Sequence, residues 1–270
     1  MAAQLDIADG PDVVLGWVTS SVRLLLRRNR RRPGELAAIG IGLPVLVDND
    51  VNIMALGERQ THYAQVDDLV LVKVATGIGS GIVSGGVLQR GAQGTAGDLG
   101  HVRVAGAEGV RCRCGNTGCL EAVAAGPAVA ATLRATGLDA RHGQDVVDLV
   151  RAGDAAAIAA VRQAGRDIGE VVAMMVNLIN PSVVVIGGQL SAAGEHLLAG
   201  LRETVYQRSL PLATEKLRIV PTRAGAEAGV LGAAAMASST CCPPRPSRPR
   251  PWRSTAPDGA PAPGPTPGSA

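Results

Sequence analysis

The chain has 270 residues, which is enough for one large domain or two smaller lobes. It is 46% hydrophobic but contains no Phe, two Trp and two Tyr, so any core must be built from Val, Leu, Ile and Ala. No uninterrupted apolar run reaches the roughly 18 residues of a membrane span. The acidic N-terminus is unlike a basic-then-apolar export signal, so we expect a cytoplasmic protein.

The charge of the chain is unevenly distributed. The formal net charge is +3, but residues 238–270 hold four arginines and one acid, and the rest of the chain holds 22 basic and 22 acidic residues. This neutral body argues against nucleic acid as the main ligand, so we expect no direct DNA binding by this chain. Residues 238–270 also contain ten of the 17 prolines and no apolar periodicity, which predicts a disordered Pro/Arg-rich tail.

In chain order, the first predicted element is an amphipathic helix over residues 11–32. The arginines near its end suit a solvated helix C-terminus, where the macrodipole favours positive charge. Short apolar strands are predicted over 38–43 and 45–47, and a buried strand over 69–74. The apolar pairs on either side of Gly85-Gly86 predict a β-hairpin.

The second half of the chain alternates helices and strands. Apolar spacing predicts a long helix that ends at Asn180-Pro181, a strand over 183–186 and a helix over about 192–207. A strand over 217–220 and a last helix over 226–237 follow. This order of elements predicts an α/β fold in which helices flank a sheet.

A loop over residues 92–119 concentrates potential metal ligands. His101, Cys112, Cys114 and Cys119 form a C-x-C-x4-C cluster with an upstream histidine, which is typical of a closed tetrahedral zinc site. The alternative is a set of unrelated thiols, one of them in a disulfide, although disulfides are disfavoured in a cytoplasmic protein. We therefore predict a structural Zn²⁺ ion as a cofactor.

Two glycine-rich segments follow predicted strands. In Thr76–Gly81 the glycines would let backbone N–H groups approach phosphate oxygens, and the Thr76 hydroxyl could add a contact. The alternative is a glycine-rich turn without a ligand. Gly187-Gly188 can be interpreted in the same two ways, as a nucleotide contact or as a tight entry into a helix.

The segment Val47–Asn52 places two acids and two amides at the end of an apolar strand. One interpretation is a carboxylate that takes a proton from a sugar hydroxyl during phosphoryl transfer. The other is Asp/Asn turn chemistry that caps the helix leading to Glu58.

Taken together and in this order, these segments resemble the ROK family (repressors, open reading frames, kinases). The resemblance covers about residues 1–237. Its most specific part is the pattern GH…CxCGxxGCLE, which runs from Gly100-His101 to Glu121. The matching segments are Asp48–Asn52 (DNDVN), Ala75–Gly81 (ATGIGSG), Gly91–His101 (GAQGTAGDLGH), Cys112–Gly126 (CRCGNTGCLEAVAAG) and Ile186–Ser191 (IGGQLS).

The resemblance implies an actin/hexokinase-like (ribonuclease H-like) two-lobed fold with sugar and ATP in the cleft. It implies that Asp50 is the catalytic base and that sugar hydroxyls are bound by Asn49, Asp98, His101 and Glu121. In an active kinase, ATP/Mg²⁺ would be held by Thr76, Gly77, Gly79, Gly187 and Gly188. His101 would also be a zinc ligand, so the metal would shape the sugar pocket rather than carry out the chemistry.

The sequence departs from the family's kinases in three ways. Those kinases begin with a strand carrying a D-x-G-x-T phosphate loop, which Met1–Asp12 does not contain, and Pro44 leads at once into Val45 where the family has a few dozen residues. We therefore expect an N-terminally truncated chain with an internal deletion: a ROK domain over 1–237, with a partial N-terminal lobe over about 1–70 and the remainder over 71–237. Asp98 stands where kinases usually have Glu, as in the regulator branch.

We therefore predict the sugar-sensing domain of a transcriptional regulator, without its DNA-binding module and with little or no kinase activity. The alternative is an ATP-dependent hexose kinase, of the glucokinase or N-acetylhexosamine kinase type, with Asp50 as base. The expected partners are a small-molecule sugar and further copies of the chain, in a homodimer or higher homo-oligomer.

Overall fold

The structure, a computed structural model, describes residues 16, 19–20, 23–24, 27–28 and 47–241. The described residues between 16 and 28 are helical, in agreement with the helix predicted over 11–32. The strand predicted over 38–43 lies outside the described residues, as do 45–46 and the tail beyond 241. The chain divides into two compact units, Met1–Asn49 and Asp50–Ala270.

The second unit is built on a five-stranded mixed sheet with the strand order β3-β2-β1-β4-β5. The central strand β1 pairs antiparallel with β2 and parallel with β4. The strands are β1 (Leu69–Val74), β2 (Ile78–Ser84), β3 (Val87–Gln89), β4 (Val183–Gly187) and β5 (Arg218–Pro221). β2 was predicted only over residues 82–83 and begins four residues earlier, so most of the glycine-rich segment predicted as a turn is strand. The other strands predicted in this part of the chain are confirmed to within a residue, and so is the hairpin. Its turn uses Gly85 and Gly86 at φ of 58° and 78°, as the favoured two-residue turn requires.

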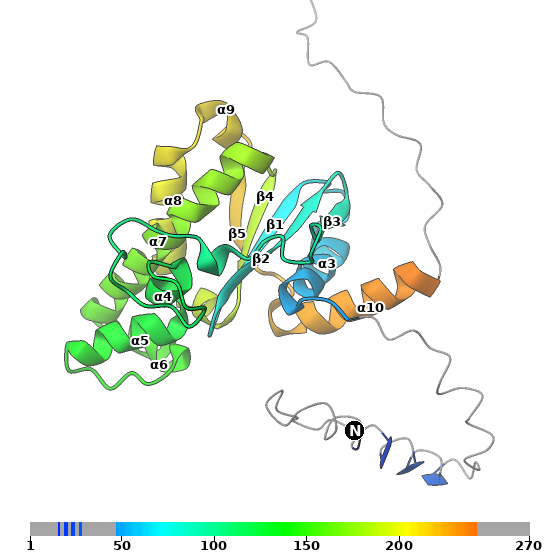
Figure 1. Ribbon diagram of the computed structural model, residues 1–270, viewed down its shortest axis with the longest axis horizontal. Coiled ribbons are helices and arrows are strands. Elements are labelled where there is room, and N and C mark those ends of the chain that lie inside the picture. Colours follow the sequence, from blue (N-terminus) through cyan, green and yellow to red (C-terminus); the bar gives the residue numbers. More distant parts are fainter. Residues whose placement is uncertain (1–15, 17–18, 21–22, 25–26, 29–46, 242–270) are drawn as a thin grey trace, which may run out of the picture. The chain divides into compact units, whose positions relative to one another are not determined.

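Helices cover both faces of this sheet (Figure 1). Strand side chains alternate, so Leu69 and Leu71 pack toward α3, whereas Val70, Val72 and Val74 join the larger core with the helices of the other face. On the α3 side lie α3 (Asp50–His62) and α10 (Ala228–Cys241). On the other side lie α4 (Leu120–Ala124), α5 (Gly126–Ala135), α6 (Gly143–Arg151), α7 (Ala155–Ile179) and α8 (Glu195–Arg208). Short helical segments complete the unit: η2 (Leu99–His101), η3 (Gln189–Ala193), α9 (Pro211–Thr214) and η4 (Gly225–Glu227).

Glycines let α3 and α10 approach backbone to backbone. A Cβ atom on Gly57 would lie 2.1 Å from the carbonyl oxygen of Ala228, and one on Gly232 would lie 1.7 Å from that of Ile53. Because α3 also packs on β1 and β2, residues 50–70 belong to the same unit as the sheet. The division between the two compact units falls at Asn49 and Asp50, and the lobe boundary expected near residue 70 stays a prediction.

Two further boundaries bear on the predictions. The long helix α7 ends as predicted, with Asn180 in the left-handed conformation at φ 51° directly before Pro181. The last helix continues to Cys241, four residues beyond the end predicted for that helix. No helix among the described residues is long and apolar enough to cross a membrane.

Candidate functional site

Asp98 precedes the short helix η2, which ends with His101 and lies against β2. The backbone N–H and the hydroxyl of Ser80 both donate to the carbonyl oxygen of Gly97, at 2.7 and 2.9 Å. A Cβ atom on Gly97 would lie 2.1 Å from the Ser80 carbonyl oxygen, so only glycine permits this approach. The backbone that carries the two predicted sugar-binding residues is thus held beside β2.

Glu121 reaches the same place from the first turn of α4. Its Oε2 accepts the backbone N–H of Ile78 at 3.3 Å, and its Oε1 accepts the Arg113 guanidinium at 3.1 Å. A Cβ atom on Gly77 would lie 2.6 Å from Oε2, so the glycine leaves room for the carboxylate. The Glu121 side chain is only 16% exposed. Arg113 was not among the predicted site residues, and it ties the cysteine loop to the turn between β1 and β2.

A hollow of about 260 Å³ opens beside Glu121. Asp50, Asp98 and His101 do not line it, so the hollow accounts for only one side of the predicted sugar site. Its lining residues come from the β1–β2 turn, the cysteine loop and the helices that follow: Thr76, Arg111, Cys112, Arg113, Glu121, Ala122, Ala125, Pro127 and Ala128.

Asp50 begins α3, and its carboxylate forms an ion pair with Lys73 of β1, with the Oδ2 and Nζ atoms 2.5 Å apart. Lys73 was not among the predicted site residues. The available signal was a single charge in LVLVKV, a strand otherwise composed of Leu and Val. Asn49 belongs to the first unit, where its backbone N–H donates to Asp48 Oδ1 at 2.8 Å.

The glycines predicted to contact a nucleotide lie at the ends of β1, β2 and β4. Gly79 is part of β2 rather than of a loop, and Gly187 ends β4. Gly188 has φ 86°, and a Cβ atom on it would lie 2.5 Å from the carbonyl oxygen of Val74. Gly188 and Gly77 are therefore both required for packing, because a Cβ atom at either position would clash with a neighbour. Contact with ATP stays a prediction for these glycines and for Thr76.

The four predicted metal ligands converge on one point. The ligand atoms of His101, Cys112, Cys114 and Cys119 all lie within 4.8 Å of one another. Cys112 Sγ is 3.6 Å from His101 Nδ1, and Cys114 Sγ is 3.7 Å from Cys119 Sγ. Tetrahedral zinc with Zn–S bonds of about 2.3 Å and Zn–N bonds of about 2.0 Å places its ligand atoms about 3.5–3.8 Å apart. The donor set and these two separations therefore fit zinc.

The backbone of the cysteine loop produces this convergence. Isolated β-bridges pair Arg111 with Thr117 and Arg103 with Cys119, and Gly115 turns the chain between them at φ 94°. A backbone hydrogen bond from Asn116 lowers the pKa of the Cys114 thiol to about 7. Burial raises the pKa of the Cys119 thiol to about 12. A nearby cation would offset that cost of burial by stabilising the thiolate.

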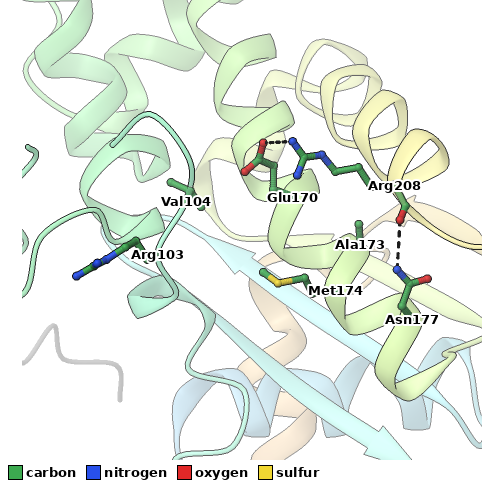
Figure 2. A pocket seen from close by; sticks show the side chains of 7 residues that line it. All are labelled: Arg103, Val104, Glu170, Ala173, Met174, Asn177 and Arg208. Atoms are coloured by element: carbon green, nitrogen blue, oxygen red, sulfur yellow. Dashed lines mark hydrogen bonds and ion pairs between the residues drawn. The ribbon is translucent and has the colours of Figure 1, made fainter. Parts of the chain in front are cut away.

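A second hollow, of about 490 Å³, lies where α7 meets the end of α8 and the strand-like segment after η2 (Figure 2). Glu170 accepts the Arg208 guanidinium at 2.7 Å, and the Asn177 amide donates to the Arg208 carbonyl oxygen at 3.3 Å. Arg103, Val104, Ala173 and Met174 complete its lining. None of the predicted site residues lies here.

Comparisons with known proteins place this geometry in a family. The model of the ROK family matches residues 25–240. A glucokinase from Halalkalibacterium halodurans is 37% identical over 205 residues, which cover 70% of this chain and 62% of the relative.

Two solved structures of the family are also similar. A ROK family transcriptional regulator, a homologue of the E. coli MLC protein, is 32% identical at a TM-score of 0.68, with 77% of this chain and 54% of that one covered. A ROK family glucokinase from Streptomyces griseus, solved with glucose and AMPPNP, is 32% identical at a TM-score of 0.64, with 73% and 69% covered. The mixed α/β sheet fits the actin/hexokinase-like fold of these neighbours. The chain thus spans less than two thirds of the glucokinase relative and about half of the regulator. It belongs to the ROK family, whose members similar to it include both sugar kinases and transcriptional regulators.

Proposed function

We propose that this chain is the sugar-binding domain of a ROK transcriptional regulator and transfers little or no phosphate. The observation that supports the proposal is that Glu121 accepts the backbone N–H of Ile78, at the start of β2, while the backbone of η2, which carries His101 and follows Asp98, packs against the same residue. Carboxylates accept hydrogen bonds from hydroxyl groups, and an imidazole with one nitrogen on a metal can donate one from its remaining N–H. Asp50 and Asn49 would complete the set of sugar contacts.

The choice of regulator over kinase is supported by Asp98. Its side chain is one methylene shorter than the Glu that the family's kinases usually carry, so its carboxylate is retracted by roughly 1 Å, a displacement that matters in a site that depends on positioning. The similarity to the regulator structure, over 77% of this chain, is in line with this choice.

We also propose that His101, Cys112, Cys114 and Cys119 hold one zinc ion with a structural role. Bound zinc would fix the fold of the cysteine loop through four ligand bonds. The loop in turn carries Arg113, which contacts Glu121. Metal binding would therefore support the sugar site through the protein, with no zinc bond to the sugar needed.

The competing function is an ATP-dependent hexose kinase, which the similarity to glucokinases supports. In that case Asp50 would accept the proton of a sugar hydroxyl, and Thr76, Gly77, Gly79, Gly187 and Gly188 would approach the phosphates of ATP/Mg²⁺. Both functions require a bound sugar. They differ in whether ATP is consumed.

Calorimetry with glucose, mannose and N-acetylglucosamine tests the sugar, and a coupled ADP assay tests turnover. We expect binding of at least one sugar, loss of that binding in Glu121→Ala, weaker binding in Asp50→Asn and negligible ADP release. Glu195→Ala, which removes an exposed acid of α8, is the matched control and should bind like the wild type. Turnover near an ordinary enzyme rate of about 10 per second would establish the kinase instead, and the absence of binding to any sugar would refute both.

A further inference from the structure

Lys73 occupies an unusual position in the central strand of the sheet. The other five residues of β1 are buried Leu or Val, whereas Lys73 is half-buried. By strand alternation its side chain lies on the face that carries α3. Its partners in register on the two neighbouring strands are Gly79 of β2 and Gly187 of β4. No side chain therefore stands beside the lysine on either neighbouring strand.

The lysine uses this space to meet Asp50 at the start of α3. The ammonium and the Oδ2 atom are in direct contact, and the two side chains are 26% and 67% exposed. Ion pairs with this degree of exposure contribute little to stability. Ordering a long lysine side chain opposes that gain. Stability is therefore a weak reason for a charge in the middle of the sheet, and a role in the adjoining site is a stronger one.

We propose that Lys73 is a positioning residue of the sugar site, which acts by holding the Asp50 carboxylate. The ammonium engages Oδ2 and fixes the orientation of the group, so that Oδ1 is directed to accept one hydroxyl of a neutral sugar. Gly79 and Gly187, which flank Lys73 on the neighbouring strands, have no side chains that would compete with the ligand for space. This inference rests on the proposed function, because it assigns a role within the same site.

A double-mutant cycle tests the proposal by calorimetry on the full chain. The probe is glucose, or mannose or N-acetylglucosamine if that sugar binds the wild type more tightly. Lys73→Met should weaken binding about tenfold, the scale of one hydrogen bond to a charged group. In the Asp50→Asn background the same substitution should change affinity less than about twofold, because the group it positions has lost its charge. Lys73→Arg, which keeps a cation on a long side chain, should restore most of the affinity.

Two controls keep the result interpretable. Arg162→Met removes an ion pair between α7 and α8 of comparable exposure and should leave binding unchanged. Thermal unfolding of each variant checks that the domain is folded at the assay temperature. Unaltered affinity in Lys73→Met, or an equal loss in both backgrounds, would overturn the role of Lys73 while leaving the sugar-binding function intact. Failure of the wild-type chain to bind any sugar would refute the proposed function itself, and this inference with it.

Discussion

Glu58 offers a sharp test of how α3 is anchored. It is fully buried in the middle of that helix, where most carboxylates would be too costly. Three donors from the segment after β5 surround it: the Thr222 hydroxyl at 2.9 Å, and the backbone N–H groups of Arg223 at 2.7 Å and Ala224 at 3.0 Å. Glu58 therefore joins the end of β5 to the helix that begins with Asp50.

The expected cost of Glu58→Ala follows from these contacts. Each hydrogen bond to a charged group contributes about 1.5–3 kcal/mol. The three hydrogen bonds to Glu58 are part-buried, so water can satisfy the donors only in part once the carboxylate is removed. The Thr222 hydroxyl can turn, and it also accepts the N–H of Gly225 at 3.1 Å, so the two backbone donors dominate the loss. We expect a destabilisation of about 3–5 kcal/mol. Glu58→Gln should cost roughly half of that, because its amide keeps one acceptor oxygen and turns a donor toward one N–H group.

Urea unfolding monitored by circular dichroism measures both changes as differences in the free energy of unfolding. Glu195→Ala is the control, since that carboxylate is 72% exposed and its ion pair with Arg202 should contribute less than about 1 kcal/mol. A cost below 1 kcal/mol for Glu58→Ala would show that solvent replaces the carboxylate easily. The reasoning from these three hydrogen bonds would then be wrong.

Three further predictions concern the metal, a glycine and a pH effect. The purified chain should contain about one zinc per chain, and chelation or Cys112→Ser should lower its melting temperature. The control His196→Gln, outside the cluster, should leave the melting temperature unchanged. Metal-free protein with an unchanged melting temperature would contradict the zinc site. Gly188→Ala should destabilise the domain by at least about 2 kcal/mol in urea unfolding, because φ is positive and the Cβ atom meets the Val74 backbone, whereas Gly109→Ala, with open space around it, should be nearly neutral. Backbone N–H groups of His142 and Arg141 lower the pKa of Asp145, so its stabilising effect on α6 is present above the unfolded pKa of about 4 and is lost as pH falls through the folded value. Hydrogen exchange in α6 should show this loss in the wild type and not in Asp145→Asn.

Elements with strong local signals could be predicted from the sequence. The alternation around Gly85-Gly86, the buried run over 69–74 and the stop at Asn180-Pro181 each depend on backbone preferences of a few neighbouring residues. The pairing of β1 with β4 could not be read in this way, because it joins segments more than a hundred residues apart. Likewise, Glu58 looked like part of a helix, and its three partners at residues 222–224 are visible only in the folded chain.

The candidate site shows the same limit. The cysteine cluster was predictable because its ligands lie close together in sequence, and the structure brings their side chains together. The two cations that contact the predicted carboxylates were missed, because Lys73 and Arg113 stand 23 and 8 residues from their partners. A charge in an apolar strand was the one available signal for Lys73. Arg113 had none, since a single arginine in a polar loop is ordinarily solvated.

The glycine-rich segment after β1 is consistent with two roles, nucleotide contact and close packing of α3, and the sequence pattern alone does not distinguish them. A Cβ atom on Gly81 would lie 2.5 Å from the Cβ of Ala55 and 2.7 Å from the carbonyl oxygen of Val51, so this glycine lets α3 pack directly on β2. That packing sets the start of α3, and with it Asp50, next to Lys73. A chain that binds sugar without ATP would therefore still need this glycine, because the packing of α3 on β2 depends on it. A glycine-rich match in this family is evidence for the arrangement of α3 on the sheet, and nucleotide binding needs its own measurement.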